Sequence, residues 1–353
     1  MCLPMNKTAK KLIDRLERGH SLEKDEYAFL VRAQNSETAA YAAEKANATR
    51  HAVYGTDVYI RGLIEVGNIC RNDCLYCGIR RSNTHADRYR LTEDEIFECA
   101  CEGYHLGFRT FVMQGGEDGA FGVEKICRTV RRIKTEFPDC AVTLSLGEFP
   151  REAYQAMFEA GADRYLLRHE TADKAHYEKL HPAEMSFDNR MRCLRDLKGI
   201  GFQVGCGFMV GSPFQTPETL AEDLKFIETF HPAMCGIGPF IPQRDTPFGG
   251  EAPGTAEQTI YLLSLLRIMQ PNLLLPATTA LGTILPDGRE RGLAAGANVV
   301  MPNLSPVSVR RKYALYDGKI CTGEEAAQCI GCLARRVRSV GTEIVIDRGD
   351  AKP

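Results

Sequence analysis

The 353-residue sequence contains no tryptophan, and none of its apolar runs approaches the roughly 18 residues that a membrane-spanning helix requires. It also lacks an excess of charge, because 44 Lys and Arg residues are balanced by 46 Asp and Glu residues, which gives a net charge of −2. We therefore expect neither a membrane nor a nucleic acid as partner. Residues 1–20 lack the apolar segment and cleavage site of a signal peptide, so we expect a cytoplasmic protein.

Cysteine, in contrast, is abundant, with 14 residues. Disulfides are not expected in a cytoplasmic protein, so clustered cysteines indicate metal or redox chemistry. The clustered cysteines form two groups, Cys70/Cys74/Cys77 and Cys321/Cys329/Cys332. The other eight are expected to be small hydrophobic residues of the interior, namely Cys2, Cys99, Cys101, Cys127, Cys140, Cys193, Cys206 and Cys235.

Short apolar runs alternate with longer helical patterns from residue 58 onward. Helix signals such as the Thr92–Glu95 capping box lie between the runs, and glycines expected to end helices precede several of them, at Gly107, Gly161, Gly201 and Gly296. The alternation predicts parallel strands in an α/β fold. We expect a (β/α)8 TIM-type barrel, closed or partly open, with a doubly wound sheet as the alternative. The eight runs span 58–66, 109–114, 141–146, 164–170, 202–210, 234–241, 273–280 and 298–302.

The barrel is expected over residues 55–310, after a helical N-terminal extension (1–54) and before a C-terminal segment (311–353). Functional residues of such barrels lie at the C-terminal ends of the strands. Six of the eight predicted strand ends carry polar groups suited to chemistry, the cysteine loop 70–77 among them. This placement predicts one functional site at that face of the barrel.

The segment "CRNDCLYC" (70–77) places three thiols on one short loop. Three thiolates can hold three irons of a [4Fe–4S] cluster and leave the fourth iron open to a ligand that is not protein. The alternative is a zinc site completed by His85 or Cys99. The spacing C-x3-C-x2-C is unusual for zinc, which favours the cluster.

This cysteine spacing, with the aromatic Tyr76 before the last cysteine, resembles the signature of the radical S-adenosylmethionine (SAM) superfamily. Longer segments, among them "RYLLRHET", "PATTALGT" and "ANVVMPNLSP", are similar to the HydE family of [FeFe]-hydrogenase maturases. The resemblance covers roughly residues 55 to 335. It implies a [4Fe–4S] cluster held by Cys70, Cys74 and Cys77, SAM bound at its open iron, and an anaerobic organism.

The resemblance also implies which residues contact SAM. Glu170 would hold a ribose hydroxyl pair or an ammonium, Arg190 would meet the carboxylate, and Met301 would pack on the adenine. The alternatives are an ion pair of Glu170 with Arg168, a helix-surface position for Arg190 and ordinary barrel packing for Met301. The turn "QGGE" would offer backbone acceptors to the SAM amine, and its glycines would allow a close approach. The SAM-binding residues implied are Tyr76, Gln114, Gly115, Gly116, Glu170, Arg190 and Met301.

Deeper in the barrel, the resemblance implies an anion-binding pocket for the substrate. An arginine inside an apolar lumen needs an anionic partner to offset its desolvation, so Arg168 independently favours an anionic substrate. Pro276 breaks the regular strand, so both Thr278 and Thr279 could face the pocket. The predicted pocket residues are Thr143, Ser145, Arg168, Thr278, Thr279 and Tyr316.

The second cysteine group, spaced C-x7-C-x2-C, corresponds to an auxiliary Fe–S site that only some members of the resembled family carry. We expect Cys321, Cys329 and Cys332 to hold a second cluster, [2Fe–2S] or [4Fe–4S], that activity does not require. The alternatives are free surface thiols or a labile zinc site.

The leading hypothesis is a radical SAM enzyme that acts in assembly of the hydrogenase H-cluster on an anionic iron–cysteine complex carrying CO and cyanide. Implied partners are an electron donor such as ferredoxin or flavodoxin and the other hydrogenase maturases. A second hypothesis keeps the chemistry but changes the substrate to a small amino-acid-like or thiol compound, as in methylornithine synthase or biotin synthase. A third is a non-catalytic Fe–S carrier, which would need no lumen arginine.

Overall fold

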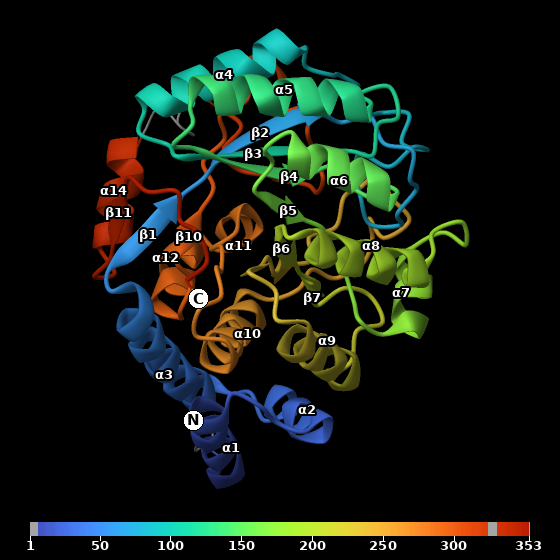
Figure 1. Cartoon of the computed structure of the whole chain (residues 1–353). Coiled ribbons are helices and arrows are strands. Elements are labelled where there is room, and N and C mark those ends of the chain that lie inside the picture. The colour runs from blue at the N-terminus through green and yellow to red at the C-terminus, as the bar shows by residue number, and fades with distance from the viewer. Residues whose placement is uncertain (1–5, 324–329, 353) are drawn as a thin grey trace.

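The computed structural model describes residues 6–323 and 330–352 (Figure 1). The strands are β1 (Asp57–Ile60), β2 (Gly62–Gly67), β3 (Thr110–Gly115), β4 (Ala141–Ser145), β5 (Arg164–Leu166), β6 (Gln203–Cys206), β7 (Met209–Val210), β8 (Met234–Cys235), β9 (Gly238–Pro239), β10 (Val299–Val300) and β11 (Glu343–Val345). The helices are α1 (Lys7–Gly19), α2 (Lys24–Arg32), α3 (Ser36–Tyr54), α4 (Glu93–His105), α5 (Val123–Glu136), α6 (Arg151–Glu159), α7 (Lys174–Leu180), α8 (Phe187–Ile200), α9 (Pro217–Phe230), α10 (Ala256–Met269), α11 (Thr279–Ile284), α12 (Gly288–Ala294), α13 (Val307–Arg310) and α14 (Ile330–Arg338).

The strands form a parallel barrel. Six of them make one sheet in the order β2-β3-β4-β5-β6-β8, and β10 pairs in parallel with β1. Isolated parallel bridges close the circle by joining Met234 to Leu274, Pro276 to Val299, and Leu63 to Asn303. The eight predicted strand positions and the (β/α)8 fold are therefore confirmed.

Side chains alternate between the lumen and the outer core along each strand. In β4, Val142 and Leu144 are fully buried in the core between strands and helices, whereas Ser145 faces the lumen. The capping box at Thr92 and Glu95 starts α4 as predicted. The predicted glycines all adopt the left-handed conformation that ends a helix, with φ of +94° at Gly107, +105° at Gly161, +113° at Gly201 and +107° at Gly296.

Helices α1–α3 lie against the barrel, with α2 on α9 and α3 on α10 (Figure 1). Glu228 of α9 joins the two parts, because its carboxylate accepts hydrogen bonds from the Tyr27 hydroxyl (2.6 Å), Ser21 Oγ (2.8 Å) and Leu22 N (3.3 Å). The division into an N-terminal extension, a barrel and a C-terminal segment stays a prediction. No helix within residues 6–323 and 330–352 has the length and apolar character needed to cross a bilayer.

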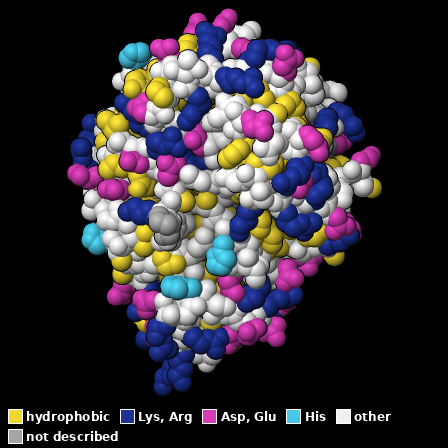
Figure 2. Space-filling view, viewed as in Figure 1, with side chains coloured by type: hydrophobic (Ala, Val, Ile, Leu, Met, Phe, Trp, Pro, Cys, Tyr) yellow, Lys and Arg dark blue, Asp and Glu magenta, His cyan; other side chains and the backbone are white. Residues whose placement is uncertain are grey.

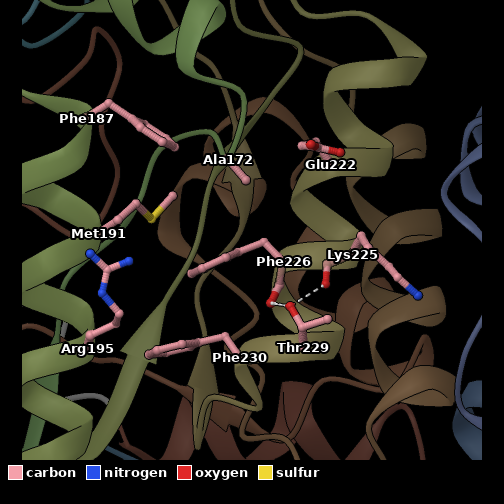
Figure 3. A pocket seen from close by; sticks show the side chains of 9 residues that line it. All are labelled: Ala172, Phe187, Met191, Arg195, Glu222, Lys225, Phe226, Thr229 and Phe230. Carbon is pink, nitrogen blue, oxygen red and sulfur yellow. Dashed lines mark hydrogen bonds between the residues drawn. The ribbon is translucent and has the colours of Figure 1, made fainter.

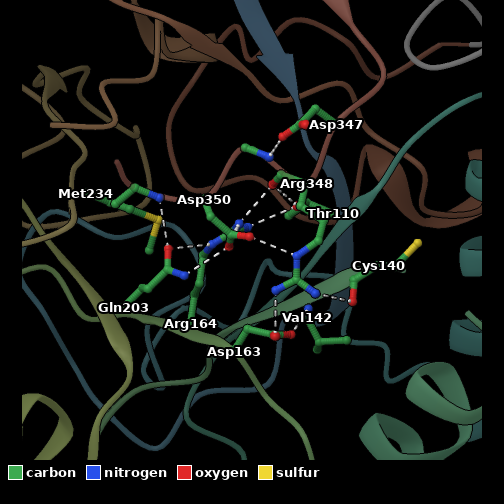
Figure 4. Close-up of polar contacts among 12 residues, drawn as sticks. Thr110, Cys140, Val142, Asp163, Arg164, Gln203, Met234, Asp347, Arg348 and Asp350 are labelled. Atoms are coloured by element: carbon green, nitrogen blue, oxygen red, sulfur yellow. Dashed lines mark hydrogen bonds and ion pairs between the residues drawn. The ribbon is translucent and has the colours of Figure 1, made fainter. Parts of the chain in front are cut away.

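The C-terminal segment closes the barrel at the N-terminal ends of the strands (Figure 4). Arg164 is fully buried there and donates to Thr110 Oγ1 (2.9 Å), Asp350 Oδ1 (2.6 Å) and the carbonyl of Arg348 (2.8 Å). Gln203 also donates to Asp350 Oδ1 (2.9 Å). Beside this floor, β11 pairs with β1. The lumen therefore opens at the other end of the barrel.

A strap, residues 313–319, crosses that other end. Its backbone is joined to the cysteine loop by the bond from Gly78 N to Leu315 O (2.9 Å), and to the segment after β9 by the bond from Asp317 N to Pro242 O (3.1 Å). Gly78 is required at the first contact, because a Cβ there would lie 2.0 Å from the carbonyl oxygen of Ala314.

A buried ion pair fixes the end of the strap. Lys319 forms a short contact with Glu65 of β2 and also donates to the Tyr313 carbonyl (2.8 Å). The Glu65 side chain is 1% exposed and the Lys319 side chain 10%. Glu65 also accepts from Asn303 Nδ2 (2.9 Å), so the carboxylate is paired and hydrogen-bonded.

Charged side chains are intermixed over the described residues of the face seen in Figure 2, without a broad region of one sign. This distribution agrees with the near-zero net charge of the chain.

Candidate active site

A cavity of about 300 Å³ lies at the C-terminal ends of the strands, beneath the strap. Its walls come from the cysteine loop, the ends of β3, β4 and β5, the β9 region and the start of α11. Thirteen of the residues predicted from the sequence line it, namely Cys70, Cys74, Tyr76, Cys77, Gln114, Gly115, Gly116, Ser145, Arg168, Glu170, Arg190, Thr278 and Tyr316. The structure therefore brings together residues spread over almost 250 positions of sequence.

The cysteine loop is held from three directions. Hydrogen bonds between its own side chains and backbone, such as that from Ser82 N to Asp73 Oδ1 (3.0 Å), stabilise the conformation of the loop. Backbone bonds then join it to the β3 turn, the end of α7 and the strap: Arg71 N to Glu117 O (2.9 Å), Leu75 N to Leu180 O (3.0 Å) and Gly78 N to Leu315 O (2.9 Å).

Burial raises the pKa of all three loop thiols, that of Cys77 to about 12 and that of Cys74 well above its usual value. Thiolates at these positions therefore need a positive partner, which a bound metal centre supplies as the protons leave. Within the described residues, no three His, Cys, Asp or Glu side chains converge on the position of a single ion. Three thiols on one loop suit a cluster in which each binds a different iron.

The two residues considered as a fourth zinc ligand lie elsewhere. The His85 side chain is 75% exposed and its Nδ1 is 2.8 Å from Asp245. Cys99 is buried in the core on α4. Neither lines the cavity, so the zinc alternative has no fourth ligand from these residues.

The glycine turn after β3 packs directly on the cysteine loop. A Cβ at Gly116 would lie 2.3 Å from the Ile69 carbonyl oxygen and 2.8 Å from Cys70 Cβ. A side chain at this position would displace the loop, which gives the glycine a packing reason in addition to the predicted approach of a ligand. Glu117 N also donates to Cys70 Sγ (3.4 Å).

Glu170 occupies a strained backbone position, with φ of +66°. Such a conformation is costly for a residue with a side chain and is retained mainly where the surrounding structure imposes it. Its Oε2 lies 3.2 Å from Arg168 Nη2, yet the geometry gives neither buried atom a hydrogen bond. Both groups therefore reach the cavity with bonding capacity left for a ligand.

Arg190 is buried although it lies on α8, where the residue alone would be interpreted as a surface arginine. Its Nε donates to Glu148 Oε1 (2.5 Å) and its Nη1 to the Arg168 carbonyl (2.6 Å). These bonds fix the guanidinium at the cavity wall. A fixed guanidinium suits a carboxylate ligand.

The predicted substrate pocket is only partly assembled on the cavity surface. Ser145, Arg168, Thr278 and Tyr316 line it, whereas Thr143 lies in the lumen with an unpartnered, buried Oγ1. Thr279 does not line the cavity, because Thr278 caps α11 by accepting from Leu281 N and Thr279 begins the helix.

Met301 is also absent from the cavity lining. It packs instead against the apolar cluster that contains Tyr54, Tyr59 and Met234. The predicted contact with adenine stays a prediction.

The second cysteine group has different surroundings. Cys321 is a free, half-buried thiol with φ of +62°, and its sulfur lies 3.9 Å from Arg289 Nη1. Cys332, on α14, is disulfide-bonded, so the expectation of a chain without disulfides is wrong at this residue. Cys329 lies outside the described residues, as does Cys2. The remaining scattered cysteines are buried as predicted, except the half-buried Cys101.

Several residues of the site were not predicted. Tyr313 and Leu315 of the strap line the cavity, and Gln114 Nε2 donates to the Tyr313 hydroxyl (3.3 Å). Glu148 follows β4 and orients Arg190. The strap belongs to a polar segment without regular periodicity, so the sequence predicts only Tyr316, the second tyrosine of "YALYDG", as a site residue.

A separate groove of about 490 Å³ lies between α8 and α9 (Figure 3). Phe187 and Met191 point into it from α8, and the stacked rings of Phe226 and Phe230 from α9. It carries no cysteine and no ion pair across it among the residues drawn, which distinguishes it from the cavity under the strap.

A sequence profile of the radical SAM superfamily matches residues 64–227. The chain is 47% identical over 307 residues to the [FeFe] hydrogenase maturase subunit HydE of Thermotoga maritima, covering 87% of each chain. It is 28% identical over 330 residues to the 3-methylornithine synthase of Methanosarcina barkeri, covering 93% of this chain and 92% of the relative.

Among solved structures, methylornithine synthase (PylB) superposes with a TM-score of 0.82 at 27% identity, covering 95% of this chain and 97% of that one. The superposition extends over nearly the whole of both chains, so the two proteins share one fold.

Proposed function

The chain belongs to the HydE family of radical SAM enzymes, and from this premise we propose that it cleaves SAM reductively in assembly of the [FeFe]-hydrogenase H-cluster. The observation that carries the proposal is the convergence of Cys70, Cys74 and Cys77 with Glu170 and Arg190 on one cavity at the barrel mouth. The family implies a [4Fe–4S] cluster and SAM as cofactors.

The residues present fit these cofactors. Three free thiols line the cavity, and the loop that carries them is hydrogen-bonded to three other parts of the chain. When bound, the cluster supplies the electron that cleaves SAM to methionine and a 5′-deoxyadenosyl radical. Arg190 would bind the SAM carboxylate and Glu170 a ribose or ammonium group, while the strap contributes Tyr313, Leu315 and Tyr316 to the cavity wall.

The substrate proposed is an anionic iron–cysteine complex with CO and cyanide ligands, attacked at its cysteine sulfur. Arg168 has donors left for an anion, because its Nε and Nη2 form no hydrogen bond among the described residues, although Nη2 lies 3.2 Å from the Glu170 carboxylate. Ser145 and Thr278 add hydroxyl groups at the same wall.

The test is an anaerobic assay of the reconstituted protein with SAM and dithionite. We expect a change in the EPR spectrum of the reduced cluster on addition of SAM, and 5′-deoxyadenosine whose formation accelerates with a synthetic iron–cysteine complex that carries CO and cyanide. A spectrum indifferent to SAM would refute the radical SAM proposal. Acceleration by amino acids or thiols but not by the iron complex would instead favour the methylornithine synthase or biotin synthase type, a candidate that the 28% identity to 3-methylornithine synthase supports.

Two finer proposals concern the second cysteine group and the partners. We infer that Cys321, Cys329 and Cys332 hold an auxiliary Fe–S cluster, and because a disulfide sulfur is not a thiolate ligand, loading must follow reduction of Cys332. Iron content after reconstitution should therefore rise when a thiol reductant precedes iron and sulfide. The partners proposed are a ferredoxin or flavodoxin as electron donor, and the other maturases.

A further inference from the structure

The loop that carries Glu170 is clamped by one carboxylate from a distant helix. Asp223 of α9 is fully buried, and its Oδ1 accepts from Ala172 N (2.5 Å) and from His169 Nε2 (3.2 Å). One oxygen atom thus holds the residue before Glu170 and the second residue after it.

The other side of the loop is bound to the link between β6 and β7. Gly207 N donates to His169 Nδ1 (3.2 Å), which leaves the ring proton on Nε2 to face Asp223. Glu170 N donates to the Gly207 carbonyl (3.0 Å). His169 is fully buried and burial lowers its pKa to about 3, so the ring is neutral and its tautomer is set by these two bonds.

Two features of this arrangement are energetically unfavourable. A carboxylate is buried on a helix whose neighbouring inward residues Leu220 and Leu224 are apolar, and Glu170 adopts φ of +66°. A leucine at position 223 would satisfy the packing of α9. Among the described residues, the hydrogen bonds of Asp223 go only to His169 and Ala172, which flank Glu170; Glu170 lines the cavity, as does Arg168.

We propose that Asp223 and His169 are positioning residues that hold Glu170 in the orientation in which its carboxylate meets SAM. The inference rests on the proposed function and adds a pair of residues 54 positions apart that act through Glu170 without touching the ligand.

The experiment measures SAM affinity by calorimetry on the cluster-loaded protein. The melting temperature is measured in parallel as a readout of stability, and the SAM-dependent EPR change as a readout of SAM at the cluster. Asp223→Leu should weaken SAM binding about tenfold, which corresponds to one lost interaction of about 1.4 kcal/mol. Asp223→Asn keeps an oxygen at the Oδ1 position and should bind within about threefold of the unchanged protein. In a Glu170→Gln background, Asp223→Leu should have no further effect on affinity, because the residue through which it acts is already altered.

Glu228→Leu is the matched control, since Glu228 is a carboxylate on the same helix whose bonds go to Ser21, Leu22 and Tyr27. It should lower the melting temperature and leave SAM affinity unchanged. His169→Phe, whose ring would lie beside Phe208 and Phe226, provides a second variant if Asp223→Leu does not fold.

Native affinity in both Asp223→Leu and His169→Phe would overturn the inference, as would an equal loss in Glu228→Leu or an additive loss in the Glu170→Gln background. If the unchanged protein does not bind SAM, both the proposed function and this inference are overturned. If the unchanged protein binds SAM and the Asp223 and His169 variants bind it equally well, the inference alone is overturned.

Discussion

The two cysteine groups contain three cysteines each, but the surroundings of the described cysteines differ. The loop 70–77 is bonded to the β3 turn, the end of α7 and the strap, and its three thiols line one cavity. Cys321 and Cys332 lie outside that cavity, and Cys332 is disulfide-bonded. The difference indicates that a catalytic ligand set is defined by the scaffold around it as much as by cysteine spacing.

The largest expected effect separates the two groups directly. Cys74→Ala should remove one iron ligand and lower SAM cleavage by roughly three orders of magnitude or more, to the background rate. The equivalent change in the other group, Cys332→Ala, should leave cleavage within about twofold, because the residue lies outside the cavity. Formation of 5′-deoxyadenosine and the EPR spectrum measure both. Loss of cleavage in Cys332→Ala would show that the groups are not independent.

The strap lies between the two groups in sequence, and its anchor should give the next largest effect. Lys319→Met leaves the Glu65 carboxylate buried without its cation, and we expect a loss of about 3–5 kcal/mol in the free energy of unfolding. The double variant Glu65→Gln/Lys319→Met removes the stranded charge and should recover part of the loss. Urea unfolding of the single and double variants provides the measurement. Equal stability of Lys319→Met and the unchanged protein would mean that the pair does not anchor the strap.

A smaller effect is expected where the end of α7 supports the cysteine loop. Tyr76 donates its hydroxyl proton to His181 Nε2 (3.1 Å), because His181 Nδ1 donates to the Tyr177 carbonyl (2.9 Å). His181→Phe should weaken SAM binding about fivefold through the loss of one buried hydrogen bond of about 1 kcal/mol.

His181→Gln keeps an acceptor and should retain most of the affinity, while Tyr76→Phe combined with His181→Phe should cost no more than either change alone. His85→Phe, at an exposed position, is the control and should bind SAM normally. Additive losses in the Tyr76/His181 pair would contradict a direct coupling.

Much of the fold was predictable from the sequence, because barrel strands and helices follow from local hydrophobic periodicity and from glycines that end helices. Strand β11 and the closed barrel floor were not, since Arg348 and Asp350 belong to a short polar tail whose partners lie on distant strands. A local pattern carries no information about such partners.

The residues of the site likewise divide into those that local sequence motifs predict and those that only the fold brings together. The cysteine loop and the turn at Gly116 are contiguous motifs, and their places in the cavity agree with the sequence-based prediction. Thr278 caps α11 and lines the cavity, whereas Thr279 begins the helix and does not line it, so its predicted contact with the substrate stays a prediction. The clamp on Glu170 was missed, since Asp223 looks like one more charged residue of a helix until the fold brings it beside His169.

The smallest expected effect concerns how α14, which carries Cys332, is attached. Val337 is its buried residue, and Arg336 joins it to α12 through a short ion pair with Glu290 and a bond to the Pro286 carbonyl (2.6 Å). The Arg336 side chain is 41% exposed, so Arg336→Ala should cost at most about 1 kcal/mol in the free energy of unfolding. Amide hydrogen exchange should nevertheless accelerate within 330–338, because the polar contacts of Arg336 join this helix to α12 and to the Pro286 carbonyl.

SAM affinity and the EPR spectrum of the cluster at Cys70, Cys74 and Cys77 should not change in Arg336→Ala, while iron loading of the second group should fall as its helix loosens. A lower SAM affinity in this variant would contradict the separation of the two groups, because it would mean that α14 is coupled to the cavity through the strap. Unchanged exchange within 330–338 would instead place the attachment of α14 in its apolar contact at Val337. Arg336→Ala therefore tests whether the second cysteine group is structurally independent of the cavity or coupled to it.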